Sequence, residues 1–254
     1  MTATERQTVQ ALLAWYEAMG VDEAIGERPI DRFGPPKQDW GEPIPTIKLA
    51  ASPAKSAADA SSVSARNATT LEELQALVAA FDGCALKRTA KNLCFARGSA
   101  RASLMLIGEA PGRDEDLQGR PFVGRAGQML DLMLAAIGLG EEHVYITNTV
   151  YWRPPGNRTP TQEEVEACAP FLARQIELLS PQVLVLLGGA AAKNILGITE
   201  GIMRLRGKWL SYRCGGHEIA TLATLHPAFL LRNPEQKRLA WRDMLMIKER
   251  LSAL

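Results

Sequence analysis

From residue 71 onward, short apolar runs alternate with stretches in which apolar residues recur every three or four positions. The short runs have the length and composition of buried strands, and the periodic stretches have the pattern of amphipathic helices. The predicted strands are SLMLIGEAPG, HVYITNTV, PQVLVLLGG and HEIATLATLHP. The predicted helices are a segment that begins after Thr70, AGQMLDLMLAAIG, a segment from Thr161 to about Leu179, AAAKNILG and residues 234–251.

Three residue patterns fix the ends of these helices. Thr70 is followed three residues later by Glu73, and Thr161 by Glu164, which is the spacing of a capping box at a helix N-terminus. Gly138 follows the last periodic residue of its helix and is typical of a C-terminal cap.

Strands that alternate with helices at this spacing indicate an α/β fold. We expect a three-layer α/β/α sandwich with a central, mostly parallel four-stranded sheet. In such sheets ligands bind at the carboxyl ends of the strands. The segments GEAPG, TNTVYWRPPGNR and LHPAFLLRNP each follow a predicted strand, so they should meet at one edge.

The first 70 residues have a different character. Residues 5–25 predict a short amphipathic helix, whose apolar stripe consists of Leu12, Leu13, Trp15, Tyr16 and Met19. A Pro- and Gly-rich stretch follows, and then LAASPAKSAADASSVSARNATT, whose small and polar residues are typical of a flexible linker. We therefore expect an N-terminal helix and linker over residues 1–70 and a catalytic domain over residues 71–254.

Composition and charge leave the partner open. The 254 residues are 46% hydrophobic and 22% charged, with a net charge of +1. Residues 71–254 carry 22 basic and 19 acidic side chains, and a short DNA footprint needs only a few local cations. There is no apolar run of about 20 residues and no signal-peptide pattern at the N-terminus. We expect a cytoplasmic monomer that does not bind membranes.

Several kinds of catalytic site are disfavoured. The chain has no G-x-S-x-G motif, and GEAPG matches neither a P-loop nor a dinucleotide fingerprint. Three histidines are too few for a His-rich metal site, and the four cysteines form no CxxC pair, which favours reduced, mostly buried thiols. His226 stands out because it ends an apolar strand at the expected active edge.

Four segments in order resemble the uracil-DNA glycosylase superfamily. They are GEAPGRDEDLQGRPFVGRAGQML, VYITNTVYWRPPGNRTPT, VLVLLGGAAAKNILG and LHPAFLLRNP. The resemblance covers about residue 80 to the end and is closest to family four, whose prokaryotic members often carry an iron–sulfur cluster.

The resemblance implies a role for several positions. Phe122 would stack on a flipped base, Asn148 would read the base edge, and His226 would donate to uracil O2 as negative charge builds there. Glu109 and Asn157 are the candidates for holding the attacking water, and the interpretation favours Asn157. The backbone at Gly108 and Ala110 would also bind the base.

Further residues are candidate DNA contacts, although ordinary surface charge explains each cation equally well. Leu230 or Leu231 would wedge into the space that the base leaves. The candidate phosphate contacts are Arg153, Arg158, Arg206, Lys208 and Arg232.

Two departures from the family pattern change the expectation. Ala110 stands where the best-studied branch has an Asp that serves the water, as it does in family four. At the family's cluster-ligand positions this chain has Phe81, Cys84, Trp152 and Cys168, so half of the thiolates are missing. We therefore expect no metal and no iron–sulfur cluster, because a cubane cluster is normally held by four thiolates.

The hypothesis is a monofunctional uracil-DNA glycosylase that flips the base and attacks the N-glycosidic bond with water. Two alternatives remain. One is a relative that binds uracil-containing DNA without turnover, and the other is a glycosylase for another deaminated base such as xanthine or hypoxanthine.

Overall fold

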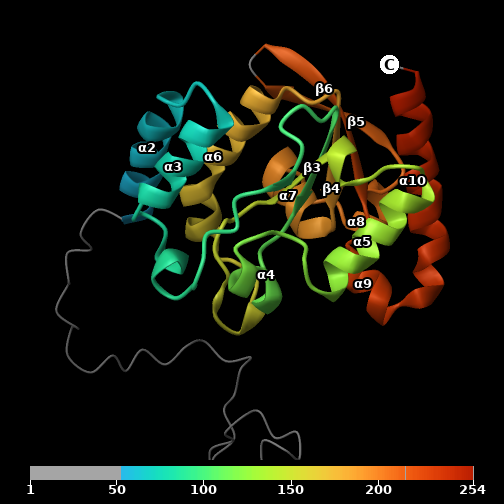
Figure 1. Cartoon of the computed structure of the whole chain (residues 1–254), viewed down its shortest axis with the longest axis horizontal. Helices are drawn as coiled ribbons and strands as arrows, with labels where there is room; N and C mark the ends of the chain where they lie inside the picture. The colour runs from blue at the N-terminus through green and yellow to red at the C-terminus, as the bar shows by residue number, and fades with distance from the viewer. Residues whose placement is uncertain (1–52, 215, 254) are drawn as a thin grey trace, which may run out of the picture. The chain divides into compact units, whose positions relative to one another are not determined.

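Six strands form one sheet in the order β1-β3-β2-β4-β6-β5 (Figure 1). A computed structural model describes residues 53–214 and 216–253. Neighbours among β3, β2, β4 and β6 run parallel, whereas β1 and β5 are antiparallel edge strands. The strands are β1 (Arg97–Gly98), β2 (Leu104–Gly108), β3 (Val144–Asn148), β4 (Val183–Leu187), β5 (Trp209–Cys214) and β6 (His217–Thr224).

The four parallel strands are those that the apolar runs predicted, but the predicted count of four was wrong. The two extra strands lie at the edges of the sheet and lack a continuous apolar run. β1 has only two residues, and β5 alternates half-buried and exposed positions. An edge strand has a neighbour on one side only, so its sequence carries a weaker hydrophobic signal.

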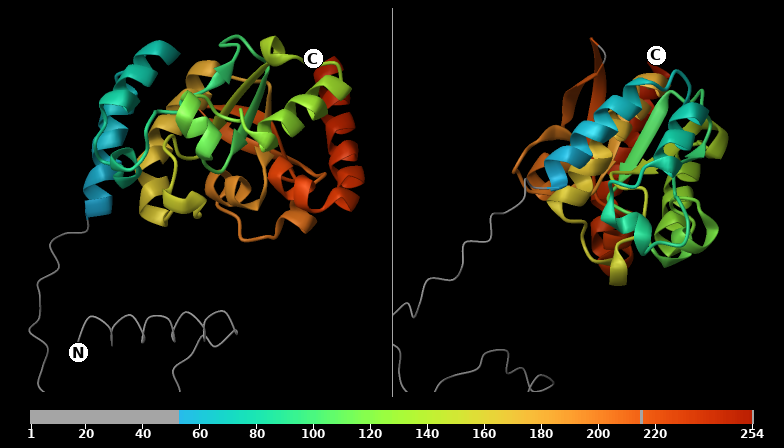
Figure 2. Two further views of the ribbon diagram at one scale, coloured as in Figure 1. Left: turned by 60° about the horizontal axis from the view of Figure 1, so that its bottom comes forward. Right: turned by 90° about the vertical axis from the view of Figure 1, so that its left-hand side faces the viewer.

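Helices cover both faces of the sheet, which confirms the three-layer α/β/α arrangement (Figure 2). Helices α5, α9 and α10 pack on one face, and α6, α7 and α8 pack on the other. The helices are α2 (Pro53–Arg66), α3 (Leu71–Ala80), α4 (Arg113–Gln118), α5 (Arg125–Ala136), α6 (Gln162–Leu179), α7 (Gly189–Leu196), α8 (Ile202–Leu205), α9 (Pro227–Arg232) and α10 (Lys237–Ser252).

Strand β2 shows why the parallel strands are apolar throughout. Leu104 and Leu106 belong to the core under α5 and α10, whereas Met105 and Ile107 belong to the core under α6 and α7. Successive side chains of a strand point to opposite faces. Because both faces are buried, every position of β2 is apolar and none alternates with a polar one.

A third apolar cluster joins α2 and α3 to α6, and it corrects the expectation of a flexible linker for residues 53–66. Ala65 and Ala68 are fully buried in this cluster beside Phe171 of α6. Alanine is the strongest helix former and its small side chain permits close helix packing. The same Ala- and Ser-rich composition resembles that of a linker. The helix predicted over residues 5–25 lies outside the described residues.

The predicted capping box of α6 is confirmed. The Thr161 hydroxyl accepts from the Glu164 N–H at 3.3 Å, and the Glu164 carboxylate accepts from the Thr161 N–H at 2.8 Å. At α3 only half of the predicted box forms. Thr70 accepts from the Glu73 N–H, but the Glu73 carboxylate accepts from the N–H of Thr69, one residue earlier.

The parallel strands end at one edge of the sheet, and their order creates a crevice there. The chain places β2 first, adds β3 on one side, and then adds β4 and β6 on the other. Connections that leave in opposite directions open a crevice between adjacent strand ends.

Within residues 53–214 and 216–253, no helix is both long and apolar enough to cross a membrane.

Candidate active site

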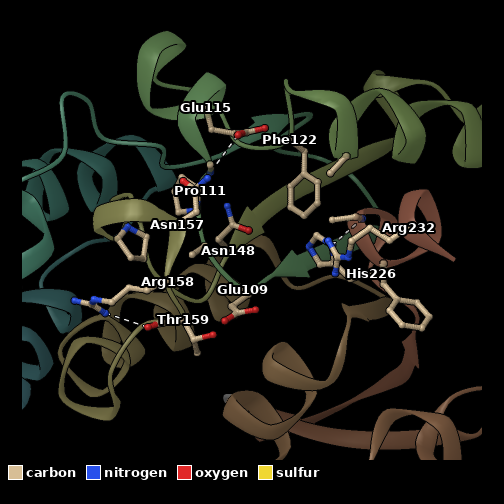
Figure 3. A pocket seen from close by; sticks show the side chains of 16 residues that line it. Glu109, Pro111, Glu115, Phe122, Asn148, Asn157, Arg158, Thr159, His226 and Arg232 are labelled. Carbon is tan, nitrogen blue, oxygen red and sulfur yellow. Dashed lines mark hydrogen bonds between the residues drawn. The ribbon is translucent and has the colours of Figure 1, made fainter. Parts of the chain in front are cut away.

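A cavity of about 460 Å³ opens at the carboxyl ends of the parallel strands (Figure 3). The segments after β2, β3 and β6 all contribute to its wall, as the sequence predicted. Its lining includes Glu109, Ala110, Phe122, Asn148, Asn157 and His226. The structure therefore brings together all the predicted catalytic residues and three of the predicted base-binding residues.

Gly108, the fourth predicted base-binding residue, makes room for two others. A Cβ at this position would lie 2.4 Å from Cζ of Phe122 and 2.5 Å from Oδ1 of Asn148. Real Cβ atoms do not approach other atoms so closely, so any side chain here would displace the aromatic ring or the carboxamide. Gly108 thus contributes by having no side chain.

The Asn148 carboxamide lies at the base of the cavity and is 1% exposed. Neither Nδ2 nor Oδ1 has a hydrogen-bond partner within the described part of the chain. A buried carboxamide without partners costs free energy. A donor and an acceptor that remain unsatisfied in a cavity wall are suited to a ligand that presents an acceptor beside a donor.

Two rings flank this carboxamide. The ring centroids of Phe122 and His226 lie 5.6 Å apart at an interplanar angle of 31°. Phe122 has a φ of 55°, which is rare for a residue with a side chain. Gly127 permits this turn, because a Cβ there would lie 1.7 Å from the Phe122 carbonyl oxygen.

His226 begins α9 and is held as a neutral imidazole. Its Nδ1 accepts from the Ala228 N–H at 3.1 Å. Burial, and to a smaller extent the charge of Arg232, lower the pKa of His226 from 6.5 to about 4. A neutral imidazole that accepts through Nδ1 carries its proton on Nε2. His226 can therefore donate one hydrogen bond through Nε2.

The two candidate water-holding residues differ in their surroundings. Glu109 lines the cavity, and its carboxylate has no hydrogen-bond partner among the described residues. Asn157 is exposed, and its Oδ1 accepts from Arg153 Nε at 2.7 Å. The two residues therefore differ in kind: Glu109 brings a carboxylate to the cavity, whereas Asn157 brings a carboxamide whose Oδ1 already accepts one hydrogen bond.

Glu115 is a site residue that the sequence analysis missed. Its carboxylate lines the cavity and accepts from the N–H groups of Gly112, Val123 and Gly124 at 3.1, 2.9 and 2.8 Å. These bonds join the start of α4 to the turn that carries Phe122. The available signal was its place three residues after Gly112, at the N3 position of a helix whose first turn is acidic.

The predicted phosphate contacts do not share one environment. Arg232 is exposed at the cavity, and Arg158 lines it but forms two hydrogen bonds with Glu164. The hydrogen bond from Arg158 lowers the pKa of the Glu164 carboxyl despite its burial. Lys208 is exposed and lies outside the cavity lining.

Arg206 was predicted to contact a phosphate, but in the structure it forms an internal ion pair. Its guanidinium donates to both carboxylate oxygens of buried Asp243 and to the Leu239 carbonyl. These bonds engage Nε and Nη2 of a side chain that is 13% exposed, and they hold the guanidinium against Asp243.

The two leucines predicted to wedge into the DNA stack differ in exposure. Leu230 is 0% exposed and belongs to the core beneath α5, so its wedge role is corrected. Leu231 is 36% exposed on the same short helix and remains the candidate.

The four residues at the family's cluster-ligand positions meet in the apolar cluster of α2, α3 and α6. The Sγ atoms of Cys84 and Cys168 lie 3.9 Å apart, and Trp152 is 3% exposed. The Phe81 ring packs edge-on against Phe171 at 5.1 Å. Two thiols and two aromatic rings do not fit a cluster that takes four thiolates. Among the described residues, no three His, Cys, Asp or Glu side chains gather in a metal-binding group.

The comparisons agree with this fold and site. The family described as the Uracil DNA glycosylase superfamily matches residues 95–245, more than half of the chain. This protein belongs to that superfamily.

Several similar proteins carry the name of one type within this superfamily. The chain is 46% identical to a "Type-4 uracil-DNA glycosylase" of Archaeoglobus fulgidus over 156 residues, which cover 60% of this chain and 78% of the relative. It is 40% identical to the protein of the same name from Thermotoga maritima over 182 residues, covering 69% and 93%. It is also 40% identical to that of Saccharolobus solfataricus, covering 67% and 81%.

We expect Glu115→Gln to lower both stability and activity. The glutamine amide would place N–H donors against backbone N–H donors, and an unsatisfied buried group costs about 1–3 kcal/mol. Urea unfolding should show a decrease of this size in the free energy of unfolding. The turn that carries Phe122 should also be fixed less firmly, because Glu115 bonds to its N–H groups. Glu249→Gln, at an exposed carboxylate of α10, is the matched control. Equal stability of the two variants would contradict the role of Glu115.

His226 should remain neutral through the physiological pH range. The pKa of His226 is about 4 in the folded chain and 6.5 for an ordinary, solvated histidine. Between these two pH values the unfolded chain therefore binds a proton that the folded chain does not. The contribution of His226 to stability is thus complete at neutral pH and is lost as pH falls from about 6.5 toward 4.

This expectation can be measured by NMR. The ring-proton shifts of His226 should stay constant between about pH 8 and about pH 5.5. The exposed imidazole of His217 gives a comparison signal in the same spectra. A midpoint for His226 near that of an ordinary histidine would show that burial does not control its protonation.

Proposed function

We propose that this protein is a monofunctional uracil-DNA glycosylase that hydrolyses the N-glycosidic bond of uracil in DNA, the first step of base excision repair. The observation that carries the proposal is the buried Asn148 carboxamide, whose two polar atoms face the cavity without a partner among the described residues. The printed names of the relatives support the same activity.

Uracil has a polar edge that matches this carboxamide. Nδ2 of Asn148 donates to uracil O4, and Oδ1 accepts from N3–H. Cytosine presents an amino group and an unprotonated N3 at the same places, so both hydrogen bonds fail. Phe122 supplies the face on which the flipped base stacks. Discrimination therefore requires that this buried amide keep Nδ2 toward O4 and Oδ1 toward N3, because an amide turned by 180° would pair with cytosine.

The departing base is stabilised by a neutral donor. As the bond from C1′ to N1 breaks, the electron pair stays on the base and negative charge appears at O2. The His226 Nε2–H donates to O2, and its imidazole gives up no proton because it carries no positive charge. A preorganised donor that faces developing charge is an effective way to lower a barrier. The released anion then takes its proton from solvent.

Water completes the reaction at C1′. The sequence favoured Asn157 for holding this water, but a carboxamide is not a base, and its Oδ1 already accepts one hydrogen bond from Arg153. We therefore assign the water to the Glu109 carboxylate, which faces the cavity and accepts the proton that the water loses. Asn157 retains its Nδ2 donor and lines the same wall.

DNA contacts are assigned to the rim of the cavity. Arg232 and Arg153 are proposed to contact phosphates, with Arg158 and Lys208 as weaker candidates. Leu231 is proposed to enter the stack when the base leaves, since its side chain is exposed beside the site. The cytoplasmic location and the monomeric state stay predictions.

Catalysis by this chain is proposed to need no iron–sulfur cluster. Phe81 and Trp152 cannot ligate iron, and their rings pack in the cluster that also buries Cys84 and Cys168. Apolar packing would then join the N-terminal helices to the loop after β3. Large-to-small changes at such buried aromatic positions cost about 3–5 kcal/mol, which is enough to anchor these segments.

The activity is tested on single- and double-stranded oligonucleotides that contain uracil, xanthine or hypoxanthine. Wild-type protein should excise uracil, and His226→Ala should lower the rate about 100-fold, or about 3 kcal/mol, with DNA binding little changed. His217→Ala, at an exposed position of β6, is the control. Binding without excision would favour the non-catalytic alternative, and excision of xanthine or hypoxanthine alone would favour the other-base alternative.

The cofactor proposal predicts a colourless enzyme. Protein purified without oxygen should contain no stoichiometric iron, and a chelator should change neither its unfolding midpoint nor its excision rate. Iron analysis and a visible absorption spectrum decide the matter. One cluster equivalent of iron with a broad absorption near the blue end would contradict it.

A further inference from the structure

Thr149, the residue after Asn148, joins the ends of β2 and β3. The residue is buried. Its backbone N–H and its side-chain hydroxyl each donate a hydrogen bond to one of two consecutive carbonyls of the neighbouring segment. Its N–H donates to the Gly108 carbonyl at 2.9 Å, and its hydroxyl donates to the Glu109 carbonyl at 2.7 Å. The residue that follows β3 therefore holds two consecutive carbonyl groups at the cavity wall.

The second of these bonds departs from regular strand geometry. Successive carbonyls of a strand point to opposite neighbours, so the Glu109 carbonyl would ordinarily face β4. It faces Thr149 on the β3 side instead. No cis peptide bond occurs among the described residues, and in a trans peptide the N–H points opposite to the C=O. The Ala110 N–H therefore points away from the Thr149 hydroxyl.

His226 enters the site from the β6 side of the sheet. The sheet order places β4 and then β6 beyond β2, and His226 follows β6. Ala110 lines the cavity. With its carbonyl held by Thr149, the Glu109–Ala110 peptide has its N–H on the side away from that bond, and both Ala110 and His226 line the cavity.

The Thr149 side chain itself lies behind the wall. It lines a separate cavity of about 150 Å³ together with Asn194 and Tyr212, and it is absent from the lining of the active-site cavity. Asn194 Nδ2 lies 3.4 Å from its hydroxyl, a long contact for a hydrogen bond. The Thr149 hydroxyl therefore does not reach the active-site cavity itself, and its bond to the Glu109 carbonyl connects it to the cavity wall.

We propose that Thr149 is a positioning residue, whose hydroxyl fixes the Glu109–Ala110 peptide so that the Ala110 N–H donates to the base beside His226. The inference rests on the proposed function, because it concerns the same uracil site. Without the hydroxyl, the Glu109 carbonyl loses its partner, and the space behind the wall allows the peptide to rotate.

The test compares Thr149→Val with Thr149→Ser in single-turnover excision at saturating protein. Valine has the shape of threonine but no donor, whereas serine keeps the hydroxyl. We expect Thr149→Val to lower the excision rate about 10-fold with DNA affinity within about twofold of wild type, and Thr149→Ser to restore most of the rate.

Thr221→Val is the matched control. Thr221 is a fully buried threonine of β6, and its hydroxyl bonds to the Ile219 carbonyl of its own strand. It therefore reports the loss of a buried hydroxyl that has no connection with the site. Its excision rate should equal that of wild type.

Three outcomes would overturn the proposal: full activity of Thr149→Val, equal impairment of the valine and serine variants, or equal impairment of Thr221→Val. If Thr149→Val does not fold, Thr149→Ala takes its place with the same expected 10-fold loss.

Titration with free uracil separates this inference from the function. If wild-type protein binds uracil but excises nothing, the proposed function fails. The positioning role then stands only if valine weakens uracil binding about 10-fold and serine does not. Wild-type protein that neither excises nor binds uracil overturns both.

Discussion

The site depends on a close approach that only a hydrogen atom allows. At position 108 the end of β2, the Phe122 ring and the Asn148 carboxamide converge so tightly that one methyl group would meet both side chains. Phe122 reaches this point through a left-handed turn, which Gly127 accommodates and the Glu115 carboxylate fastens. The position of the Phe122 ring is thus set by backbone packing, and the ring has little freedom to move.

Much of the fold could be predicted from the sequence because burial on both faces leaves an unambiguous pattern. β2 and β4 are apolar at every position, and their helices repeat at the expected spacing. The edge strands were missed because a strand with one neighbour need not be apolar. Helix α2 was missed because an Ala- and Ser-rich stretch reads as a linker until α6 is there to cover it.

The site residues divide along the same line. His226 and Asn148 stand at strand ends, so sequence order sufficed to place them at one edge, whereas Phe122 lies between α4 and α5 and was marked only by the family resemblance. The hydrogen-bond partner of a charged side chain cannot be predicted from sequence order. Arg206 pairs with Asp243, 37 positions later, and Glu115 bonds to backbone groups that carry no sequence signal. Leu230 and Leu231 are neighbours on a short helix, and only packing distinguishes the buried one from the exposed one.

The sheet order has a consequence for how the protein comes to be active. Its site is built from the ends of β2, β3 and β6, and the last of these is completed near the C-terminus, after β4 has been inserted between β2 and β6. Contacts between such distant parts of a chain form late in folding. A chain still emerging from the ribosome, or one cut before His226, lacks a wall of the cavity and the imidazole that the described lining contains. The cavity is therefore enclosed only after synthesis has passed His226 and the segment that follows β6 has docked beside the ends of β2 and β3.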